Sequence, residues 1–346
     1  MTSKPTIILD PHARRMDEIF SPADRKRLYQ MAHVIGGSDE PMPQAEFEAA
    51  LPDAEAVICW DWRYGNDLLR KAPKLRAIFS VEGGFPIGLD YAYCYANTIR
   101  VLSVAPSFAR QVAEMCVGMA LACSREIVLG DLKMRRGDEE YLHAGNTSTF
   151  MLYGQPVGII GYGGIAHALH PLLRPFDVEV SAYDPWLGDG YLRRLGVKPK
   201  SLEALLAESR VIFVLAAPTV ENRAFLGHPE LAHIQQGAVM VLMSRAHVVD
   251  FDALTEYVVA GRFKLATDVF PTEPLAADHP LRSAEGAVLS AHRAGSVKEG
   301  LWEIGEMVVD DLEMVLRGFP PRRCLNAEPE LSQRYATIVV DRGDDE

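Results

Sequence analysis

Short apolar runs alternate with helical segments along most of the chain, and this alternation restricts the possible folds more than any other feature. Strands that alternate with helices form parallel sheets covered by helices on both faces. The first third therefore predicts an α/β unit. Its predicted strands lie at 6–9, 56–59, 75–81 and 99–104, and helical spacing is found at 22–34 and 44–51.

A second alternating series follows a long helical pattern at 106–137, which begins with Pro106 and Ser107 as a start signal. Another helical pattern at 297–317 ends at Gly318 and Pro320. The chain thus predicts two doubly wound parallel-sheet domains, the second inserted into the first. The second series has predicted strands at 156–163, 178–184, 210–218, 238–244, 264–270 and 287–292, with helices at 203–208 and 252–260.

Composition excludes several classes of protein. A chain of 346 residues that is 48% hydrophobic and 24% charged is typical of a globular protein of two domains. The net charge of −12 disfavours nucleic-acid binding, which needs a basic face. Five scattered cysteines without a C-x-x-C pair suit packing residues in a reducing compartment, and predict no metal site. Without a signal-peptide or membrane-spanning run, we expect a cytoplasmic protein.

The stretch VGIIGYGGIAHAL carries a dinucleotide-binding pattern directly after a predicted strand. Gly161 permits the tight turn, Gly163 lets backbone approach a pyrophosphate, and Ala166 allows close helix–strand packing. Asp184 ends the next strand, 23 residues after Gly161. A carboxylate there accepts hydrogen bonds from ribose hydroxyls and repels a 2′-phosphate. The pattern predicts NAD as cofactor, in preference to NADP.

Three residues with acid–base or anion-binding side chains follow predicted strands of the second series. Arg245 ends VLMSR, Glu273 follows DVFPT, and His292 ends VLSAH. Carboxyl ends of parallel strands form the rim of the ligand crevice, so these side chains are expected to converge on one substrate.

The order of these motifs resembles the D-isomer-specific 2-hydroxyacid dehydrogenase family, from about residue 55 to residue 326. The shared elements are GYGGIA, YD, AAP, MSR, DVFPTEPL, HPL and AHRAG. The resemblance implies a Rossmann NAD-binding domain at 105–299 inserted into a flavodoxin-like substrate domain formed by 1–104 and 300–346. It also implies a homodimer, in which the helix after Pro106 takes part.

By the same resemblance, Arg245, Glu273 and His292 match the family's catalytic arginine, glutamate and histidine. Such a set can transfer a hydride between nicotinamide and a D-2-hydroxy acid or 2-keto acid. His292 would be the acid or base, Glu273 would hold its ring, and Arg245 would bind the substrate carboxylate and carbonyl. The implied cofactor-binding residues are Gly161, Gly163, Gly164, Ile165, Asp184, Pro218, Met243, Ser244, Asp268 and Gly295, with Asp268 near the carboxamide and Pro218 near the adenosine.

The substrate loop departs from the family pattern. It matches VEGGFPIGLD at 81–90, where Glu82, Gly83 and Gly84 are the predicted substrate-binding residues. Their backbone N–H groups can receive a carboxylate. The usual basic residue is replaced by Val81 or Glu82, and the second glycine by Phe85, which would narrow or line the pocket.

A second departure lies in CWDWRYG at 59–65, where Asp61 stands at the position that is basic in phospho-acid members and Arg63 follows two residues later. These departures predict a non-phosphorylated substrate. Trp60 and Trp62 are equally compatible with pocket walls and with packing, and Arg293 has no assigned role. Two other functions stay open: a formate dehydrogenase-like enzyme, which Glu273 in place of glutamine disfavours, and a non-catalytic NADH-sensing protein.

Overall fold

Two α/β units make up the computed structural model, which describes residues 4–332 and residue 334. Within these residues, unit 1 comprises 4–108 and the segment from 295 onward, and unit 2 comprises 109–294. Both units contain a mainly parallel sheet, which confirms the predicted α/β class. Among the described residues, no helix combines the length and the apolar character needed to cross a membrane.

Unit 1 is built on a six-stranded sheet in the order β13-β5-β4-β3-β1-β2. The first five strands along the chain are parallel and follow the flavodoxin-like order 2-1-3-4-5. The sixth, β13, pairs antiparallel with β5. The strands are β1 (Thr6–Asp10), β2 (His33–Gly36), β3 (Ala54–Cys59), β4 (Ala77–Ser80), β5 (Arg100–Ser103) and β13 (Leu325–Asn326).

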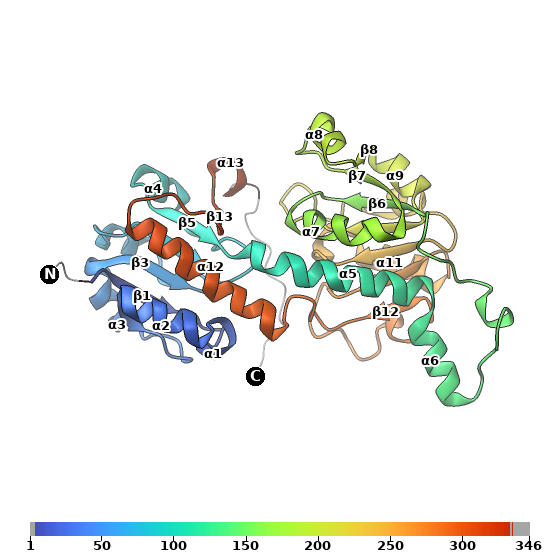
Figure 1. Ribbon diagram of the computed structural model, residues 1–346, viewed down its shortest axis with the longest axis horizontal. Helices are drawn as coiled ribbons and strands as arrows, with labels where there is room; N and C mark the ends of the chain where they lie inside the picture. Colours follow the sequence, from blue (N-terminus) through green and yellow to red (C-terminus); the bar gives the residue numbers. More distant parts are fainter. Residues whose placement is uncertain (1–3, 333, 335–346) are drawn as a thin grey trace. The chain divides into compact units, whose positions relative to one another are not determined.

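Helices cover both faces of this sheet, so its central strands are buried on both sides. Along β1, Ile7 and Leu9 belong to one hydrophobic cluster and Ile8 to the other. On the first face α12, from late in the chain, packs beside α1 and α2 (Figure 1). The helices are α1 (Met16–Ile19), α2 (Pro22–Met31), α3 (Gln44–Ala50), α4 (Tyr91–Ala96), α12 (Lys298–Leu316) and α13 (Pro329–Ser332), with 3-10 turns at Leu51–Asp53, Asn66–Lys71 and Ala105–Phe108.

Unit 2 is built on a seven-stranded parallel sheet in the order β12-β11-β10-β9-β6-β7-β8. Numbered within the unit, this is the Rossmann order 3-2-1-4-5-6 with one further strand, and its switch point lies between β6 and β9. The strands are β6 (Pro156–Ile160), β7 (Glu179–Tyr183), β8 (Lys198–Pro199), β9 (Val211–Val214), β10 (Val239–Leu242), β11 (Lys264–Thr267) and β12 (Ala287–Leu289).

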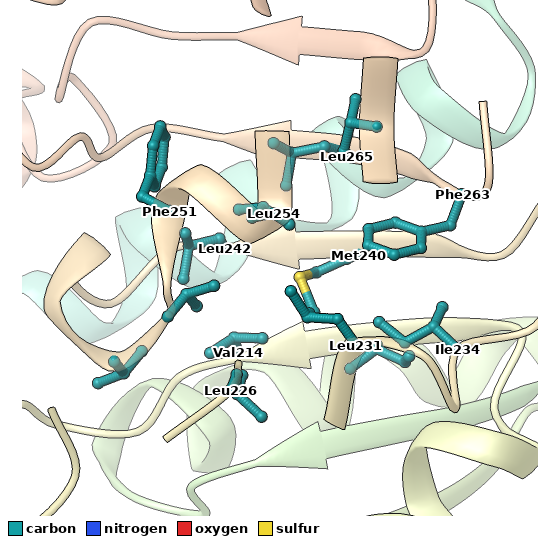
Figure 2. Packing of buried hydrophobic residues seen from close by; sticks show 14 of the residues in the cluster. Val214, Leu226, Leu231, Ile234, Met240, Leu242, Phe251, Leu254, Phe263 and Leu265 are labelled. Atoms are coloured by element: carbon teal, nitrogen blue, oxygen red, sulfur yellow. The ribbon is translucent and has the colours of Figure 1, made fainter. Parts of the chain in front are cut away.

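One hydrophobic core of unit 2 lies under α9, α10 and α11. Figure 2 shows Met240 and Leu242 of β10 packed with Leu231 of α10 and Leu254 of α11, all fully buried. The other face is covered by α5 and α7, which pack against each other. The helices are α5 (Ala109–Ser124), α6 (Ile127–Arg136), α7 (Gly164–Leu173), α8 (Asp189–Arg194), α9 (Leu202–Glu208), α10 (His228–Leu231) and α11 (Phe251–Val259), with 3-10 turns at Ala144–Asn146, Arg174–Phe176, Ala246–Val248 and Pro280–Ser283.

Two sequence predictions of long helices were wrong. The helix expected at 22–34 ends at Met31, and His33–Gly36 instead form edge strand β2 beside β1. The helix expected at 106–137 is broken at Glu126, whose backbone is left-handed (φ +52°). Lys264 Nζ and Ser148 Oγ both donate to the Glu126 carboxylate at 2.6 Å. These bonds fix the break, so α6 projects from the rest of unit 2 (Figure 1).

Candidate functional site

The glycine turn after β6 has the geometry that a bound dinucleotide requires. Gly161 is left-handed (φ +85°), and a Cβ there would lie 2.4 Å from the Cα of Ala216. A Cβ on Gly163 would meet nothing within 4 Å, so the backbone at this point is open to a ligand. Ala166 is fully buried against the sheet. The turn leads into α7, whose first N–H groups, from Gly164 and Ile165, are suited to bind phosphate.

Asp184 lies at the carboxyl end of β7, beside the glycine turn. One of its carboxylate oxygens accepts the N–H of Tyr162 at 2.7 Å, and the other accepts the N–H of Trp186 at 2.8 Å. These bonds fix the carboxylate and still leave lone pairs for further donors. Asp184 also borders a cavity of about 320 Å³, lined by Ala182, Tyr183, Asp184, Asp189, Leu192, Pro199, Lys200 and Ser201.

The segments after β9 and β10 carry three further predicted cofactor contacts of this unit. Pro218 follows β9, and Met243 and Ser244 follow β10. The Oγ of Ser244 is buried and has no hydrogen-bond partner within the part of the chain that the structure describes. A buried hydroxyl without a partner calls for a ligand group, so this position fits a bound dinucleotide.

His292 and Glu273 form a hydrogen-bonded pair after strands β12 and β11. His292 Nδ1 lies 2.7 Å from Oε2 of Glu273. The other oxygen of Glu273, Oε1, accepts the N–H of Phe270 at 3.1 Å. The carboxylate is therefore held at both ends, and the Nε2 atom of His292 faces away from it. The His292 side chain is 34% exposed, which leaves Nε2 available to a substrate.

The surroundings of Glu273 stabilise the negative charge of its carboxylate. Burial alone would raise the pKa of Glu273, but hydrogen bonds from His292 and Phe270 outweigh burial and lower the pKa. The positive charges of His292 and Arg245 add to this lowering. Glu273 therefore stays ionised and accepts the Nδ1–H of His292. Arg245 itself follows β10, and its Nη1 donates to the carbonyl of Ser244 at 2.8 Å.

Asp268 has a role that the sequence did not reveal. Its carboxylate oxygens accept the N–H groups of Arg293 and Ala294, both at 2.9 Å, and its carbonyl accepts the N–H of His292 at 2.9 Å. His292 is left-handed (φ +50°), a conformation that a histidine rarely adopts without support. Asp268 is therefore a positioning residue that fixes the turn and aims the imidazole, while the side chain of Arg293 is exposed.

Replacing Asp268 with asparagine is expected to disturb this turn. Each carboxylate oxygen of Asp268 now accepts a backbone N–H. In the variant, the NH2 group of asparagine would face one of these N–H groups, and two donors cannot form a hydrogen bond. The side chain is only 2% exposed, so loss of that bond should destabilise the fold by about 1–3 kcal/mol. Because His292 would lose its orientation, kcat should fall more than KM rises. Urea unfolding and steady-state kinetics check both effects, and unchanged kcat would contradict the positioning role.

The predicted substrate loop lies after β4 in unit 1. Gly83 and Gly84 are exposed, and a Cβ on Gly83 would lie 3.6 Å from the ring of Phe108. The carbonyl of Glu82 accepts Ser103 Oγ at 3.3 Å. Gly295, expected near the cofactor, also lies against Phe108: its Cβ would come within 3.0 Å of that ring. The loop is thus packed against Phe108 and hydrogen-bonded to Ser103, while its two glycines leave the backbone exposed.

In the loop after β3, some aromatic and charged residues are buried and others are partly exposed. Trp62 is buried in a hydrophobic cluster that also contains Phe85, so packing accounts for both side chains. Trp60 is only partly buried and faces the guanidinium of Arg14. Asp61 accepts the N–H of Ile87 at 3.0 Å, which ties this loop to the substrate loop. Arg63 pairs with the buried Asp10 at 2.7 Å.

Other histidines and the cysteines have structural contacts. Nδ1 of His279 accepts the N–H of Leu281, as a turn residue does. His170 shares a hydrogen bond with Tyr162, 2.5 Å long, on the helix after the glycine turn. All five cysteines are free and buried. Within residues 4–332 and 334, no group of three or more His, Cys, Asp or Glu side chains is arranged to hold a metal ion.

Comparison with known proteins shows the family to which this chain belongs. Residues 117–294 match the family model described as D-isomer specific 2-hydroxyacid dehydrogenase, NAD binding domain. D-3-phosphoglycerate dehydrogenase of Archaeoglobus fulgidus is 27% identical over 82% of this chain and 54% of its own length. Glyoxylate reductase of Aeropyrum pernix is 28% identical over 81% of this chain and 85% of its own length. The chain thus spans about half the length of the curated phosphoglycerate dehydrogenases that it matches.

A solved structure extends the similarity to both units. The crystal structure of a phosphoglycerate oxidoreductase from Rhizobium etli has a TM-score of 0.82 and 36% identity, and the match covers 94% of this chain and 99% of that one. The family model alone matches more than half of the 346 residues. This protein therefore belongs to the D-isomer-specific 2-hydroxyacid dehydrogenase family, whose members are NAD(P)-binding oxidoreductases.

Proposed function

We propose that this protein transfers a hydride between NAD and a D-2-hydroxy acid or 2-keto acid. The observation that carries the proposal is the His292–Glu273 pair, 2.7 Å long, at the carboxyl ends of neighbouring strands in a unit with a dinucleotide turn. The names of its relatives, glyoxylate reductase and phosphoglycerate dehydrogenase, support the same substrate class. Unit 2 would bind the cofactor and unit 1 the substrate.

His292 would move the proton. When a 2-keto acid is reduced, the protonated imidazole donates Nε2–H to the carbonyl oxygen; in the reverse direction neutral Nε2 accepts the hydroxyl proton. Glu273 accepts Nδ1–H in both states and stabilises the imidazolium by its charge. The nicotinamide, when bound, would supply or accept the hydride at the substrate C2. Proton and hydride together account for the two hydrogens gained or lost.

Arg245 would hold the substrate. A guanidinium can form a two-pronged hydrogen bond with the carboxylate and also reach the 2-oxygen, where negative charge develops during reduction. Its position after β10 places it on the same sheet edge as His292 and Glu273. The backbone N–H groups at Glu82, Gly83 and Gly84 would receive the carboxylate from unit 1.

NADH oxidation tested against a panel of 2-keto acids checks this function. The panel includes glyoxylate, hydroxypyruvate, phosphohydroxypyruvate and sugar-derived acids, and turnover of at least one is expected. Turnover of formate with NAD⁺ would instead support the formate dehydrogenase alternative. NADH-dependent binding of a partner protein without turnover of any acid would support the NADH-sensing alternative. The direction that prevails in the cell depends on the NADH supply.

Asp184 is proposed to make the enzyme prefer NAD over NADP. Replacing it with serine keeps an acceptor near Tyr162 N and removes the charge that would repel a 2′-phosphate. The ratio of kcat/KM for NADH to that for NADPH should fall by about 10- to 100-fold, a change of 1.4–2.8 kcal/mol. A matched change on the same unit but away from the cavity that Asp184 borders, Asp252→Ser on α11, should shift the ratio far less. Equal shifts in the two variants would contradict the assignment.

A homodimer is proposed, with α6 in its interface. None of the side chains of this helix is buried. Its apolar residues Ile127 and Met134 are each 57% exposed, and Leu142, which follows the helix, is 86% exposed. Clustered exposed apolar side chains mark interaction surfaces. Sedimentation velocity should show a dimer for the wild type and a monomer for the double variant Ile127→Asp, Met134→Asp. The control Val259→Asp, an exposed apolar residue on α11, should remain dimeric.

A further inference from the structure

Arg14 stands at the place in unit 1 where a doubly wound sheet offers a binding site. It lies between β1 and α1, just beyond the carboxyl end of β1. Trp60 lies just beyond β3, the neighbouring strand. In the order β2-β1-β3-β4-β5, the chain leaves β1 and β3 in opposite directions, and ligands of such sheets bind at this switch point.

The guanidinium of Arg14 is held by neighbours that leave part of it unused. Its Cζ lies 5.1 Å from the ring centre of Trp60 and 5.9 Å from that of Phe108. Its Nη1 donates to Glu18 at 2.9 Å. Its Nε, by contrast, is buried and has no hydrogen-bond partner among the described residues. Since Glu18 takes Nη1, the free edge is the one formed by Nε and Nη2, the edge that forks onto an anion.

The other arginine at this switch point is already satisfied. Arg63 donates from Nε and Nη2 to Asp10, and from Nη2 to the carbonyl of Met42 as well. Tyr64 also donates to Asp10. Arg63 therefore completes a buried network that joins the loops after β1 and β3. Arg14 is the arginine here with an unmade hydrogen bond, and leaving a buried donor without a partner is unfavourable in the absence of a ligand.

We propose that Arg14 binds a second anionic group, a phosphate or a carboxylate, at the end of the 2-keto acid remote from the reacting carbonyl. This inference rests on the proposed function. The ring of Phe108 contacts Arg14 and also borders Gly83, so the guanidinium and the substrate loop lie against the same aromatic ring. Arg14 would thus supply the positive charge that is absent at Val81, Glu82 and Asp61. On this proposal, the lack of a basic residue at those positions does not argue against a phosphorylated substrate.

The test compares KM values for acids with one and with two anionic groups. Glyoxylate and hydroxypyruvate carry one, phosphohydroxypyruvate adds a phosphate, and 2-ketoglutarate and oxaloacetate add a carboxylate. In Arg14→Gln, KM for a doubly anionic substrate should rise by about 10- to 100-fold, as for a lost charge-assisted hydrogen bond. KM for singly anionic acids should change less than about threefold. The substrate with the larger rise identifies phosphate or carboxylate as the ligand.

Arg15 provides a matched control, because it is the adjacent arginine and its side chain is 67% exposed, paired with Asp17 and Asp39. Arg15→Gln removes the same charge and should leave every KM near the wild-type value. Arg14→Lys keeps the charge but not the fork, and should give intermediate KM values. It also serves as the second variant if Arg14→Gln does not fold, as judged by circular dichroism.

The outcomes separate the two proposals. If the wild type reduces singly anionic acids and Arg14→Gln changes KM equally for all substrates, or for none, the Arg14 site is wrong and the proposed function stands. Equal effects of Arg14→Gln and Arg15→Gln also overturn it, since they would reflect long-range charge only. If the wild type turns over none of the acids, the proposed function fails, and the Arg14 site fails with it.

Discussion

Replacing His292 with alanine should lower kcat by a factor on the order of 10² to 10⁴, the contribution of a well-placed general acid or base. NADH affinity should stay close to the wild-type value, because the glycine turn and Asp184 are formed by other segments of unit 2. Single-turnover kinetics and fluorescence titration with NADH measure the two quantities separately. The large effect on one and the small effect on the other distinguish a proton carrier from a residue that supports the fold.

His279 offers a control for this variant. It is also a histidine of unit 2, but its Nδ1 accepts the N–H of Leu281 in a turn. His279→Ala should cost about 0.5–2 kcal/mol of stability through the lost cap, with kcat nearly unchanged. If His292→Ala abolished NADH binding, or lowered kcat no further than His279→Ala does, His292 would have to be regarded as a structural residue.

Replacing Gly161 with alanine should disrupt the cofactor turn even before a cofactor binds. The new Cβ would lie 2.4 Å from Ala216 Cα and 2.6 Å from its N, and the residue would keep a left-handed backbone. Backbone must shift to relieve such a contact, at an expected total of about 2–4 kcal/mol. Thermal unfolding without cofactor should show this loss, and NADH affinity should fall by more than about tenfold.

Gly163→Ala separates steric strain from ligand contact. Nothing lies within 4 Å of the position that its Cβ would take, and its backbone is extended. The variant should therefore unfold near the wild-type temperature without cofactor, yet bind NADH more weakly because the Cβ intrudes on the phosphate approach. If both glycine variants were equally stable without cofactor, the close contact at Ala216 would not constrain the turn.

The sequence predicted the parts of the fold that repeat a strong pattern. Buried strands such as β6, β9 and β10 are continuous apolar runs; Gly161 follows β6 directly, and Arg245 lies three residues after the end of β10. The positions of Gly161, Arg245 and His292 after strands of unit 2 could be predicted for this reason. Edge strand β2 could not, because His33–Gly36 are only partly buried or exposed and pair with β1 along one side.

Contacts between residues distant in sequence were equally hidden. The break at Glu126 depends on Lys264, 138 positions later, and nothing in the local helical pattern marks it. Asp268 could be matched to the cofactor by resemblance, but its bonds to the N–H groups of Arg293 and Ala294 exist only once β11 and β12 are side by side. Arg14 lies in no recognised motif, and its unmade hydrogen bond is a property of packing alone.

Because Asp268 fixes the turn of His292 within unit 2, mutations in unit 1 and mutations in unit 2 should have different consequences in evolution. Every bond that orients His292 is made within unit 2, by Asp268 and Glu273. Arg14 and the glycine loop at 82–84 belong to unit 1. If Arg14 and this loop bind the substrate and His292 carries the proton, as proposed, mutations in unit 1 would alter which acid is accepted while the proton carrier stays in place. Selection for a new substrate can act on one unit without first rebuilding the chemistry of the other.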